Sequence, residues 1–496
     1  MANAQADTYL LALDQGTTSS RAILYNSLLQ PQCSAAFEFE QHYPHNGWVE
    51  HDAEDLWQTT LQSCQQVIRD SGIEPHQIRA LGITNQRETT LLWERSSGKV
   101  LSNAIVWQDR RTARFCDNLK QQGLEPLFRE RTGLLLDPYF SATKLRWLLD
   151  NVEGARDAAR RGELCFGTVD CYLLWRLTNG KVHATDASNA SRTLLMNLAT
   201  RQWDNELLEI LDIPASVLPE IRDNASDFGH TDTEFFGHPI AISAMVGDQQ
   251  GALIGQACIH KGMLKSTYGT GCFALLNTGP SPIFSDNRLL TTLAYQLNGE
   301  ATYALEGSIF MAGAIIQWLR DSLGVLSTSA ESETLAEGVD YQQSEILVPA
   351  FTGLGAPYWD PDARAALFGM TRDTGREELA AAALKSVAMQ SQDLLQAMAG
   401  DGQPATRLRV DGGMTDNRWF LQALSDMTGL PVERAAISEA TSLGAAFLAG
   451  LQSGVFSSLD DITALHQVDI EFNSNLSASI RDEIRQRWLA AVAKIR

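Results

Sequence analysis

The stretch LLALDQGTTSSRAILY occupies residues 10–25 and decides how the first half of the chain folds. Apolar runs at 10–13 and 22–25 flank a polar loop that contains one glycine, two threonines and two serines. Apolar runs joined by a short turn with glycine are typical of a β-hairpin. Backbone N–H groups in so tight a turn converge on one point and form a concave anion site. The stretch therefore predicts an anion-binding hairpin, with an ordinary hairpin turn as the alternative.

The polar side chains of this loop suit a phosphate group and its metal ion. Thr17, Thr18 and Ser19 supply hydroxyl donors, and Arg21 supplies a fixed positive charge. Asp14 lies at the end of the first strand, where its carboxylate could hold Mg²⁺ together with phosphate oxygens and water. The loop is not a P-loop, because the sequence GxxxxGK followed by Ser or Thr is absent and a strand is predicted after the glycine.

A second hairpin is predicted by MLKSTYGTGCFALLNTG at residues 263–279, with Gly269, Thr270 and Gly271 in its turn. Because one such loop lies in each half of the chain, the sequence predicts an internal duplication with a cleft between the halves. The run from Gly269 to Ala274 also matches the dinucleotide motif GxGxxA. A strand continues where that motif requires a helix, so a dinucleotide-binding fold is not expected.

The chain as a whole is predicted to be an α/β protein with two large domains. Its 496 residues exceed what one hydrophobic core supports, and predicted strands such as 78–86 alternate with predicted helices such as 141–152. With the boundary near residue 255, we expect an N-terminal domain at 1–254 and a C-terminal domain at 255–496.

Composition and charge exclude several classes of function. The chain is 44% apolar and 20% charged, and its formal net charge is −21. This charge argues against nucleic acid and anionic membrane as partners, and no apolar run is long enough to span a bilayer. The seven cysteines show no metal-ligand spacing, and the N-terminal segment lacks the features of a secretory signal. A cytoplasmic location with reduced thiols is therefore expected.

Two candidate sites lie at predicted strand ends. Asp248 follows the strand at 239–247 and begins a helix, where unpaired backbone amides favour a carboxylate. It is a candidate catalytic base, and a simple helix cap is the alternative. Arg87 and Glu88 are adjacent in NQRETT at residues 85–90, and a donor beside an acceptor suits neighbouring hydroxyl groups. The alternative for Arg87 and Glu88 is a charged pair on the surface.

Other candidates are aromatic residues and helix positions. Trp107 in IVWQDRRT and Tyr139 in DPYFSATK each combine an apolar ring with a polar tip, or are ordinary core or surface aromatics. Gly313 and Gln317 are four residues apart and share one helix face, which suits either a flat ligand or close helix packing. VDGG ahead of TDN, at 410–417, lets the backbone approach a nucleotide at a helix start.

Taken together, these segments resemble the FGGY family of carbohydrate kinases, in the actin and hexokinase superfamily. The resemblance runs almost from end to end and is carried by DQGTTSSR, NQRETT, IVWQDRRT, YFSATK, GDQQGAL, STYGTGCF, FTGLGAPYWDPDARA, VDGGMTDN and ATSLGAAFLAG. NQRETT with WQDRRT is the pattern of the members that act on glycerol. The resemblance implies two actin-like, ribonuclease H-like domains that close over a central cleft for ATP and substrate.

The resemblance also implies roles for individual residues. The residues of the polyol site would be Arg87, Glu88, Trp107, Tyr139, Asp248, Gln249 and Phe273. The residues of the nucleotide site would be Thr17, Thr18, Ser19, Arg21, Thr270, Gly313, Gln317, Gly413 and Asn417. The metal would be held by Asp14 and Asp248. The first domain would then carry the polyol site and first phosphate loop, and the second domain the second phosphate loop and adenosine site.

The implied reaction is the phosphorylation of glycerol by ATP, with Mg²⁺, to sn-glycerol 3-phosphate and ADP, in glycerol uptake and catabolism. Asp248 would accept the proton of a terminal hydroxyl as that oxygen attacks the γ-phosphorus. A homodimer or homotetramer is expected. Some bacterial members bind fructose 1,6-bisphosphate through a loop rich in glycine and arginine. The corresponding segment at 226–243 has acidic residues and no arginine, so inhibition by this ligand is expected to be weak or absent.

Two other functions stay open at this point. A family member acting on a pentulose, erythritol or a similar polyol would share the phosphate loops, although Trp107 and Phe273 leave little room for a larger sugar. A nucleotide-switching scaffold protein with the actin-type fold would also keep the phosphate loops. Such a protein would not need the Arg87 and Glu88 pair beside Asp248.

Overall fold

The structure is a computed structural model that describes residues 8–340, 342, 345–360, 362–437 and 439–496. These residues form two compact units, each made from three segments of the chain. Unit 1 consists of the described residues within Met1–Ala257, Thr292–Tyr303 and Glu439–Leu465. Unit 2 consists of those within Cys258–Thr291, Ala304–Ser438 and His466–Arg496.

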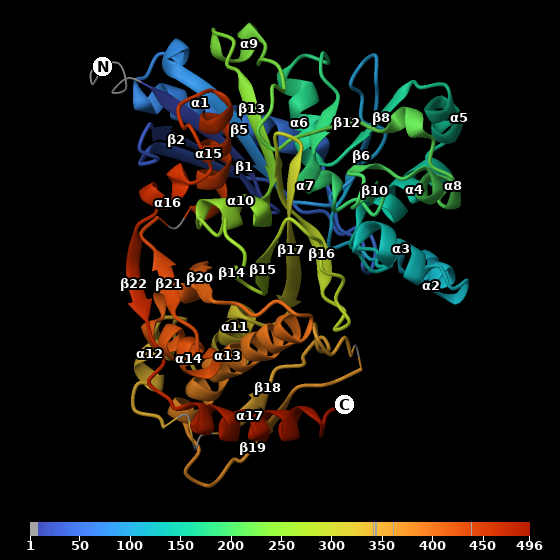
Figure 1. Cartoon of the computed structure of the whole chain (residues 1–496). Helices are drawn as coiled ribbons and strands as arrows, with labels where there is room; N and C mark the ends of the chain where they lie inside the picture. The colour runs from blue at the N-terminus through green and yellow to red at the C-terminus, as the bar shows by residue number, and fades with distance from the viewer. Residues whose placement is uncertain (1–7, 341, 343–344, 361, 438) are drawn as a thin grey trace. The chain divides into compact units, whose positions relative to one another are not determined.

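Unit 1 is built on a five-stranded sheet with the order β13-β5-β1-β2-β3 (Figure 1). Its strands are β1 (Tyr9–Gln15), β2 (Ser19–Asn26), β3 (Pro31–Glu38), β5 (Ile78–Asn85) and β13 (Ile242–Gly247). Strand β2 is antiparallel to both of its neighbours, β1 and β3, whereas β5 runs parallel to β1 and β13 parallel to β5. The parallel arrangement brings the carboxyl ends of β1, β5 and β13 to one edge of the sheet.

Alternate residues of β1 contact helices on opposite faces of the sheet, as strand geometry requires. Leu11 and Leu13 belong to the same buried cluster as Leu56 of helix α1 (Ala53–Ser71). Leu10 faces the other way, toward Gly450 of helix α15 (Ala440–Gln452). The sheet is therefore covered by one helix from the start of the chain and one from near its end.

Helix α15 joins unit 1 because glycines let it approach helix α10 (Asp248–Gly255) backbone to backbone. A Cβ added at Gly444 would lie 1.9 Å from the carbonyl oxygen of Gly251. One added at Gly255 would lie 1.9 Å from the carbonyl oxygen of Ala440. Only glycine fits at these crossings, so the packing also fixes the helix that begins at Asp248.

The rest of unit 1 is a set of short elements, and all of them except α16 lie between the strands of this sheet in the sequence. The helices are α2 (Ala113–Gln121), α3 (Glu125–Thr132), α4 (Ser141–Asn151), α5 (Ala155–Arg160), α6 (Val169–Leu177), α7 (Ala187–Ala190), α8 (Asn205–Ile210), α9 (Thr233–Phe236) and α16 (Asp461–Leu465). The strands are β4 (Glu50–His51), β6 (Leu91–Glu94), β7 (Ala104–Ile105), β8 (Leu164–Gly167), β9 (Ala184–Asp186), β10 (Met196–Asn197), β11 (Gln202–Trp203) and β12 (Glu220–Arg222).

A seven-stranded sheet has the order β16-β17-β15-β14-β20-β21-β22. Most of its residues belong to unit 2, whereas Thr292–Tyr303, within β16 and β17, group with unit 1. The strands of this sheet are β14 (Met263–Tyr268), β15 (Cys272–Gly279), β16 (Leu290–Leu297), β17 (Glu300–Ile309), β20 (Arg407–Asp411), β21 (Val432–Ala435) and β22 (Val468–Phe472). Strand β15 is antiparallel to β14, β20 is parallel to β14, and β21 is parallel to β20. The strands β14, β15, β20 and β21 thus repeat the pairing of β1, β2, β5 and β13, as the two similar loops predict.

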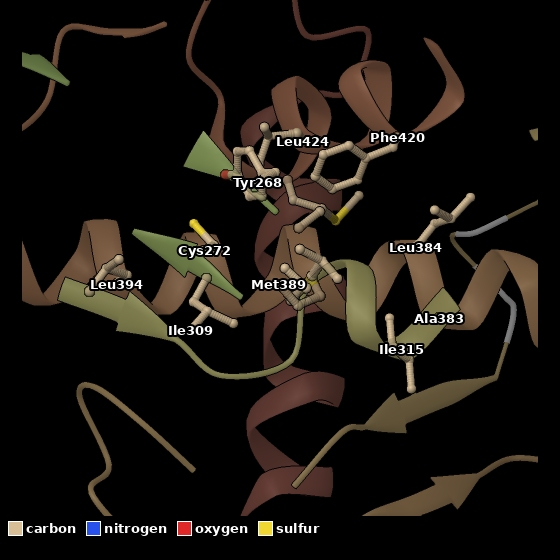
Figure 2. Packing of buried hydrophobic residues seen from close by; sticks show 14 of the residues in the cluster. Tyr268, Cys272, Ile309, Ile315, Ala383, Leu384, Met389, Leu394, Phe420 and Leu424 are labelled. Atoms are coloured by element: carbon tan, nitrogen blue, oxygen red, sulfur yellow. The ribbon is translucent and has the colours of Figure 1, made fainter. Parts of the chain in front are cut away.

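The helices of unit 2 enclose a core that anchors the β14–β15 turn. They are α11 (Gly313–Asp321), α12 (Glu331–Ala336), α13 (Arg376–Gly400), α14 (Arg418–Thr428) and α17 (Ala478–Val492), and a small sheet is formed by β18 (Ile346–Val348) and β19 (Ala366–Phe368). Figure 2 shows Tyr268 beside Phe420, whose rings meet edge to face at 5.1 Å. Tyr268 and Cys272 flank the turn and are both buried, so the turn is held at each end by the core.

The α/β class and the two predicted hairpins are confirmed by these sheets. A single cut at residue 254/255 does not describe the units, however, because Thr292–Tyr303 and Glu439–Leu465 group with unit 1. The reason is packing that no local sequence pattern expresses, above all the glycine crossing of α10 and α15. In the described part of the chain, no helix combines the length and apolar character that a membrane crossing requires.

We predict that Gly444→Ala lowers the free energy of unfolding by about 3 kcal/mol, because the added methyl group forces α15 away from α10. The change is measured as a drop in the midpoint of thermal or urea unfolding. Gly338→Ala is the control, since nothing lies within 4 Å of a Cβ added there, and it should change stability by less than about 0.5 kcal/mol. Equal losses in the two variants would contradict the close helix crossing.

Candidate functional site

In unit 1, the turn between β1 and β2 lies beside the carboxyl end of β5. Asp14 pairs in register with Arg21 on β2 and with Thr84 on β5. The side chain of Gln86 donates to the carbonyl oxygen of Gly16 at 3.0 Å and so ties this turn to the segment after β5. The first loop and the NQRETT segment, which are far apart in sequence, are therefore adjacent in the fold.

The turn itself has the tight geometry that the sequence predicts. Gly16 N donates to Ser19 O at 2.9 Å, which closes the turn. Thr18 is exposed, whereas Thr17 and Ser19 are half-buried. The hydroxyl of Thr17 accepts a hydrogen bond of 3.0 Å from the indole N–H of Trp107. A residue expected in the nucleotide site thus contacts a residue expected in the polyol site.

Arg21 has a partner that the sequence did not indicate. Its Nη1 lies 2.5 Å from Oε2 of Glu439, the residue that precedes helix α15, and both side chains are more than one-third exposed. An ion pair this exposed is screened by solvent and worth little in stability. The guanidinium can therefore exchange this carboxylate for another anion at low cost.

The NQRETT segment is buried throughout, and the interpretation of Arg87 and Glu88 as a surface pair is wrong. Only 3% of Arg87 and 1% of Glu88 is exposed. Arg87 Nε lies 3.1 Å from Oδ1 of Asp248. Removing charges from water is costly unless they are paired, so this contact constrains both side chains. Local sequence could not distinguish the two interpretations, because burial is set by distant segments.

Arg87 makes further contacts that fix its planar group. Its Nη1 donates to Oε1 of Gln250 at 3.3 Å, and its Nη2 lies 3.5 Å from the hydroxyl of Tyr139. A Cβ added at Gly247 would lie 2.8 Å from Cδ of Arg87. The absence of a side chain at Gly247 thus lets the arginine lie directly against the end of β13.

Glu88 adopts an unusual backbone conformation, with φ of 60°, a left-handed geometry that is costly for a residue with a side chain. Its carbonyl oxygen accepts hydrogen bonds of 3.0 Å from the hydroxyls of Thr90 and Ser141. Its side-chain Oε1 accepts a hydrogen bond of 2.7 Å from Nε of Arg192. Backbone and side chain of Glu88 are therefore both held in place.

Trp107 and Tyr139 form one aromatic wall near this charged group. Their rings meet edge to face with centroids 5.6 Å apart, and both residues are half-buried. The ammonium of Lys144, itself fully buried, donates to the carbonyl oxygen of Tyr139. Burial lowers the pKa of Lys144 to about 8, although nearby carboxylates including Glu88 oppose the shift. Lys144 acts from within α4 to fix the position of Tyr139.

Asp248 is the first residue of α10, and 32% of its side chain is exposed. Its Oδ1 accepts from the backbone N–H of the next residue, Gln249, at 2.6 Å. The N-cap of α10 is Gly247, which has no side chain to cap the helix, so the alternative interpretation of Asp248 as a simple helix cap is wrong. Burial, together with the nearby Asp248 carboxylate, raises the pKa of Asp14 to about 7, against the opposing effect of Arg21. Two carboxylates therefore repel each other at this position, an arrangement that a cation relieves.

Unit 2 brings the second loop against the start of α11. Gly313 N donates to Gly269 O at 2.8 Å, and Ala314 N donates to Thr270 O at 3.0 Å. A Cβ added at Gly313 would lie 2.7 Å from Gly269 O, so a larger residue does not fit. Thr270 itself is exposed.

The remaining nucleotide candidates of unit 2 lie around this loop or one turn away from it. Gly413 begins a 3₁₀ turn (Gly413–Asp416) and is exposed, with open space where a Cβ would be. Asn417 caps α14, accepting from Phe420 N at 2.8 Å. Gln317 is exposed one turn after Gly313. Phe273 is half-buried on β15 of unit 2, whereas the other polyol candidates belong to unit 1.

Four residues that contact the site were missed by sequence reasoning: Lys144, Arg192, Gln250 and Glu439. Gln250 lies two residues after Asp248 in GDQQGAL, so its place at the start of the same helix could have indicated that it lies near the site. Arg192 and Glu439 lie far from their partners in sequence, and no local pattern indicates them.

Across the described residues, no group of three or more His, Cys, Asp or Glu side chains is placed to bind a metal.

Family models and curated relatives match this chain over most of its length. Residues 9–255 match the model for the N-terminal domain of the FGGY family of carbohydrate kinases, and residues 264–453 match the model for its C-terminal domain. A glycerol kinase of Ectopseudomonas mendocina is 56% identical over 98% of this chain and 99% of its own length. Glycerol kinase 1 of Pseudomonas aeruginosa is 54% identical over 98% of this chain and 99% of its own length.

Solved structures confirm the expected two-domain α/β fold. A glycerol kinase of Plasmodium falciparum, solved with ADP, superposes with a TM-score of 0.94 at 36% identity and 98% coverage of both chains. A gluconate kinase of Lactobacillus acidophilus shares the fold alone, with a TM-score of 0.89 at 22% identity over 99% of this chain and 97% of its own. Both domain models and the full-length relatives lead to one conclusion: this chain belongs to the FGGY family of carbohydrate kinases.

Proposed function

We propose that this chain phosphorylates glycerol with ATP to give sn-glycerol 3-phosphate and ADP. The observation that carries the proposal is the buried contact of Arg87 and Glu88 beside Asp248, with Arg87 Nε 3.1 Å from Asp248 Oδ1. A scaffold protein that only binds a nucleotide has no use for so costly an arrangement. The similarity to proteins named glycerol kinase over nearly the whole chain points to the acceptor.

The polyol is bound by groups that match its alternating donors and acceptors. Arg87 offers N–H donors and Glu88 offers an acceptor, as neighbouring hydroxyl groups require. Trp107 and Tyr139 cover the carbon chain with an apolar surface and add a phenol hydroxyl. The proposed set also includes Gln249 and Phe273.

ATP is bound through the two loops of the duplicated sheets. The first loop supplies Thr17, Thr18, Ser19 and Arg21, whose ion pair with Glu439 is exposed enough to yield to a phosphate. In unit 2, the proposed contacts to the nucleotide are Thr270, Gly313, Gln317, Gly413 and Asn417. The absence of a side chain at Gly413, where a Cβ would meet only open space, lets the ligand approach the backbone closely, whereas Gly313 lets the second loop pack against the start of α11.

Asp248 is the proposed general base. It accepts the proton of a terminal hydroxyl while that oxygen bonds to the γ-phosphorus of ATP, and the bond to the leaving ADP oxygen breaks in line. Arg87 orients the Asp248 carboxylate from 3.1 Å, and the helix N-terminus fixes its backbone. General-base help contributes about 10²–10⁴-fold in rate, and positioning with charge neutralisation accounts for the rest.

Mg²⁺ fits this site because Asp14 and Asp248 repel each other until a cation lies near them. Magnesium takes one or two protein carboxylates together with phosphate oxygens and water, and two carboxylates are what unit 1 offers. When bound, the ion neutralises charge on the transferring phosphoryl group. The protein's contribution is to hold Asp14 at the end of β1 and to orient Asp248.

We also propose the expected cytoplasmic location and a homodimer or homotetramer, together with weak or absent inhibition by fructose 1,6-bisphosphate. The segment at 226–243 supports the last point, because it contains no arginine. Asp232 in this segment is half-buried and caps helix α9. A bisphosphate would meet negative rather than positive charge there.

Comparison of acceptors tests the proposed function. At equal concentrations of glycerol, D-xylulose and erythritol, we expect kcat/KM to favour glycerol by at least about 100-fold, because a longer polyol must displace the aromatic wall of Trp107 and Tyr139. ADP release is measured in a coupled assay. Preference for D-xylulose or erythritol would identify another kinase of the family, and absence of acceptor-dependent ADP release would support a scaffold function.

We predict that Asp248→Asn lowers kcat by at least about 100-fold, because the amide cannot accept the hydroxyl proton. Glycerol and ATP should bind with dissociation constants within a few-fold of the parent, as measured by calorimetry. The matched control is Asp52→Asn, which replaces another aspartate at a helix start, Asp52 accepting from Glu54 N at 2.7 Å. Turnover within a few-fold of the parent in the Asp248 variant would show that another group is the base.

We predict that Asp14→Asn raises the Mg²⁺ concentration for half-maximal rate by about tenfold at pH 8, because one of the two carboxylates is lost. In the parent, the pKa of Asp14 is about 7, so protons compete with the cation below that pH. Lowering the pH from 8 to 6 should therefore raise the Mg²⁺ requirement more in the parent than in the variant.

The control for the magnesium experiment is again Asp52→Asn, with ATP held constant and free Mg²⁺ varied. Titration of ATP itself changes the Mg²⁺ requirement equally in Asp14→Asn and in the parent. Only the difference in Mg²⁺ requirement between these two proteins therefore reports on Asp14. An unchanged Mg²⁺ requirement in Asp14→Asn would remove this residue from the metal site.

A further inference from the structure

Arg192 is a buried arginine to which the proposed reaction assigns no role. None of its side chain is exposed, and its Nε donates to Oε1 of Glu88 at 2.7 Å. The same oxygen lies 3.9 Å from Nε of Arg87. Glu88 therefore lies between two guanidinium groups, and one of them contacts Asp248.

Hydrogen bonds connect the segment just before Arg192 to the ends of β5 and β13, the strands that lead into the site. Asp186 caps α7 by accepting from Ser188 N at 2.7 Å. The Ser188 hydroxyl accepts from Gly247 N at 3.0 Å, directly before Asp248. Asn189 donates to Oδ1 of Asn85, at the end of β5, at 2.9 Å. The position of Arg192 is thereby coupled to both β5 and β13.

Aromatic rings complete the environment of Arg192. Its guanidinium carbon lies 5.7 Å from the centre of the Tyr139 ring and 5.4 Å from that of Phe140. A guanidinium is attracted to the faces of aromatic rings at this range. Arg192 thus contacts two members of the proposed polyol set, Glu88 from one side and Tyr139 from another.

We propose that Arg192 is a positioning residue for the polyol, acting through the carboxylate of Glu88 and the ring of Tyr139. A carboxylate has about four lone-pair directions, and an anchor on one oxygen sets where the others point. The hydroxyl groups of the substrate can then be received only in one arrangement. This role rests on the proposed function, since it concerns recognition of the same acceptor.

The chemistry of the pair favours arginine over lysine at position 192. The planar guanidinium of Arg192 can donate to Glu88 while it lies against the aromatic rings of Tyr139 and Phe140. An ammonium is a more strongly hydrated point charge. Buried ion pairs contribute little net stability compared with apolar residues of the same volume. The pair is therefore better explained by the geometry that it imposes on Glu88 than by stabilisation of the fold.

The test compares Arg192→Lys and Arg192→Met in the full-length protein. For Arg192→Met we expect KM for glycerol to rise at least about 30-fold while KM for ATP stays within about threefold, because only the acceptor contacts Glu88. Arg192→Lys should recover part of the loss, since it keeps a positive charge beside Glu88. Thermal unfolding of each variant measures damage to the fold separately.

The control is Arg176, which is also ion-paired and stacked in unit 1 but lies outside the site. Its Nη1 is 2.8 Å from Oε2 of Glu54, and its guanidinium lies 4.6 Å from the Trp57 ring. Arg176→Met should leave both KM values unchanged, even where it lowers the unfolding midpoint.

The outcomes separate this proposal from the proposed function. If the parent does not phosphorylate glycerol, the proposed function fails, whatever the variants do. If the parent is active and Arg192→Met keeps its KM for glycerol, the positioning role is overturned. Equal increases of both KM values, with no recovery in Arg192→Lys, would likewise overturn it, because general damage would then explain the loss.

Discussion

The contact between the Arg87 guanidinium and the Asp248 carboxylate is the interaction on which the site in unit 1 depends. Only 2% of the arginine side chain is exposed, so its charge must have partners close at hand. The contact requires β5 and β13 to end side by side and Gly247 to lack a side chain. Parallel pairing of the two strands satisfies the first requirement, and the glycine at the last position of β13 satisfies the second.

The same constraint explains why a segment near the end of the chain belongs to unit 1. Helix α10 starts at Asp248, and glycines hold it against α15 at a distance that no side chain permits. Residue Glu439, directly before α15, is thereby placed beside Arg21 of the first loop. Packing of one helix pair therefore positions both the proposed base and the exposed ion pair at the phosphate loop.

Much of the local structure could be predicted from sequence. The β1–β2 and β14–β15 hairpins follow from apolar runs around Gly/Thr turns, and the helix at Asp248 follows from its place after a strand. Whether Arg87 and Glu88 were exposed or buried could not be predicted. Burial depends on Tyr139, Arg192 and other residues that reach the pair only in the folded chain.

The sequence by itself determined the strand and turn chemistry, the duplicated loops and the family, because each depends on residues that are neighbours in the chain. Tertiary structure decided the pairing of Glu88 with Arg192, the pairing of Arg21 with Glu439, and the raised pKa of Asp14. These properties arise from charges and carbonyl groups that approach within a few ångströms across long sequence separations. Electrostatic energies change steeply over such distances and with burial, so only the folded chain defines them.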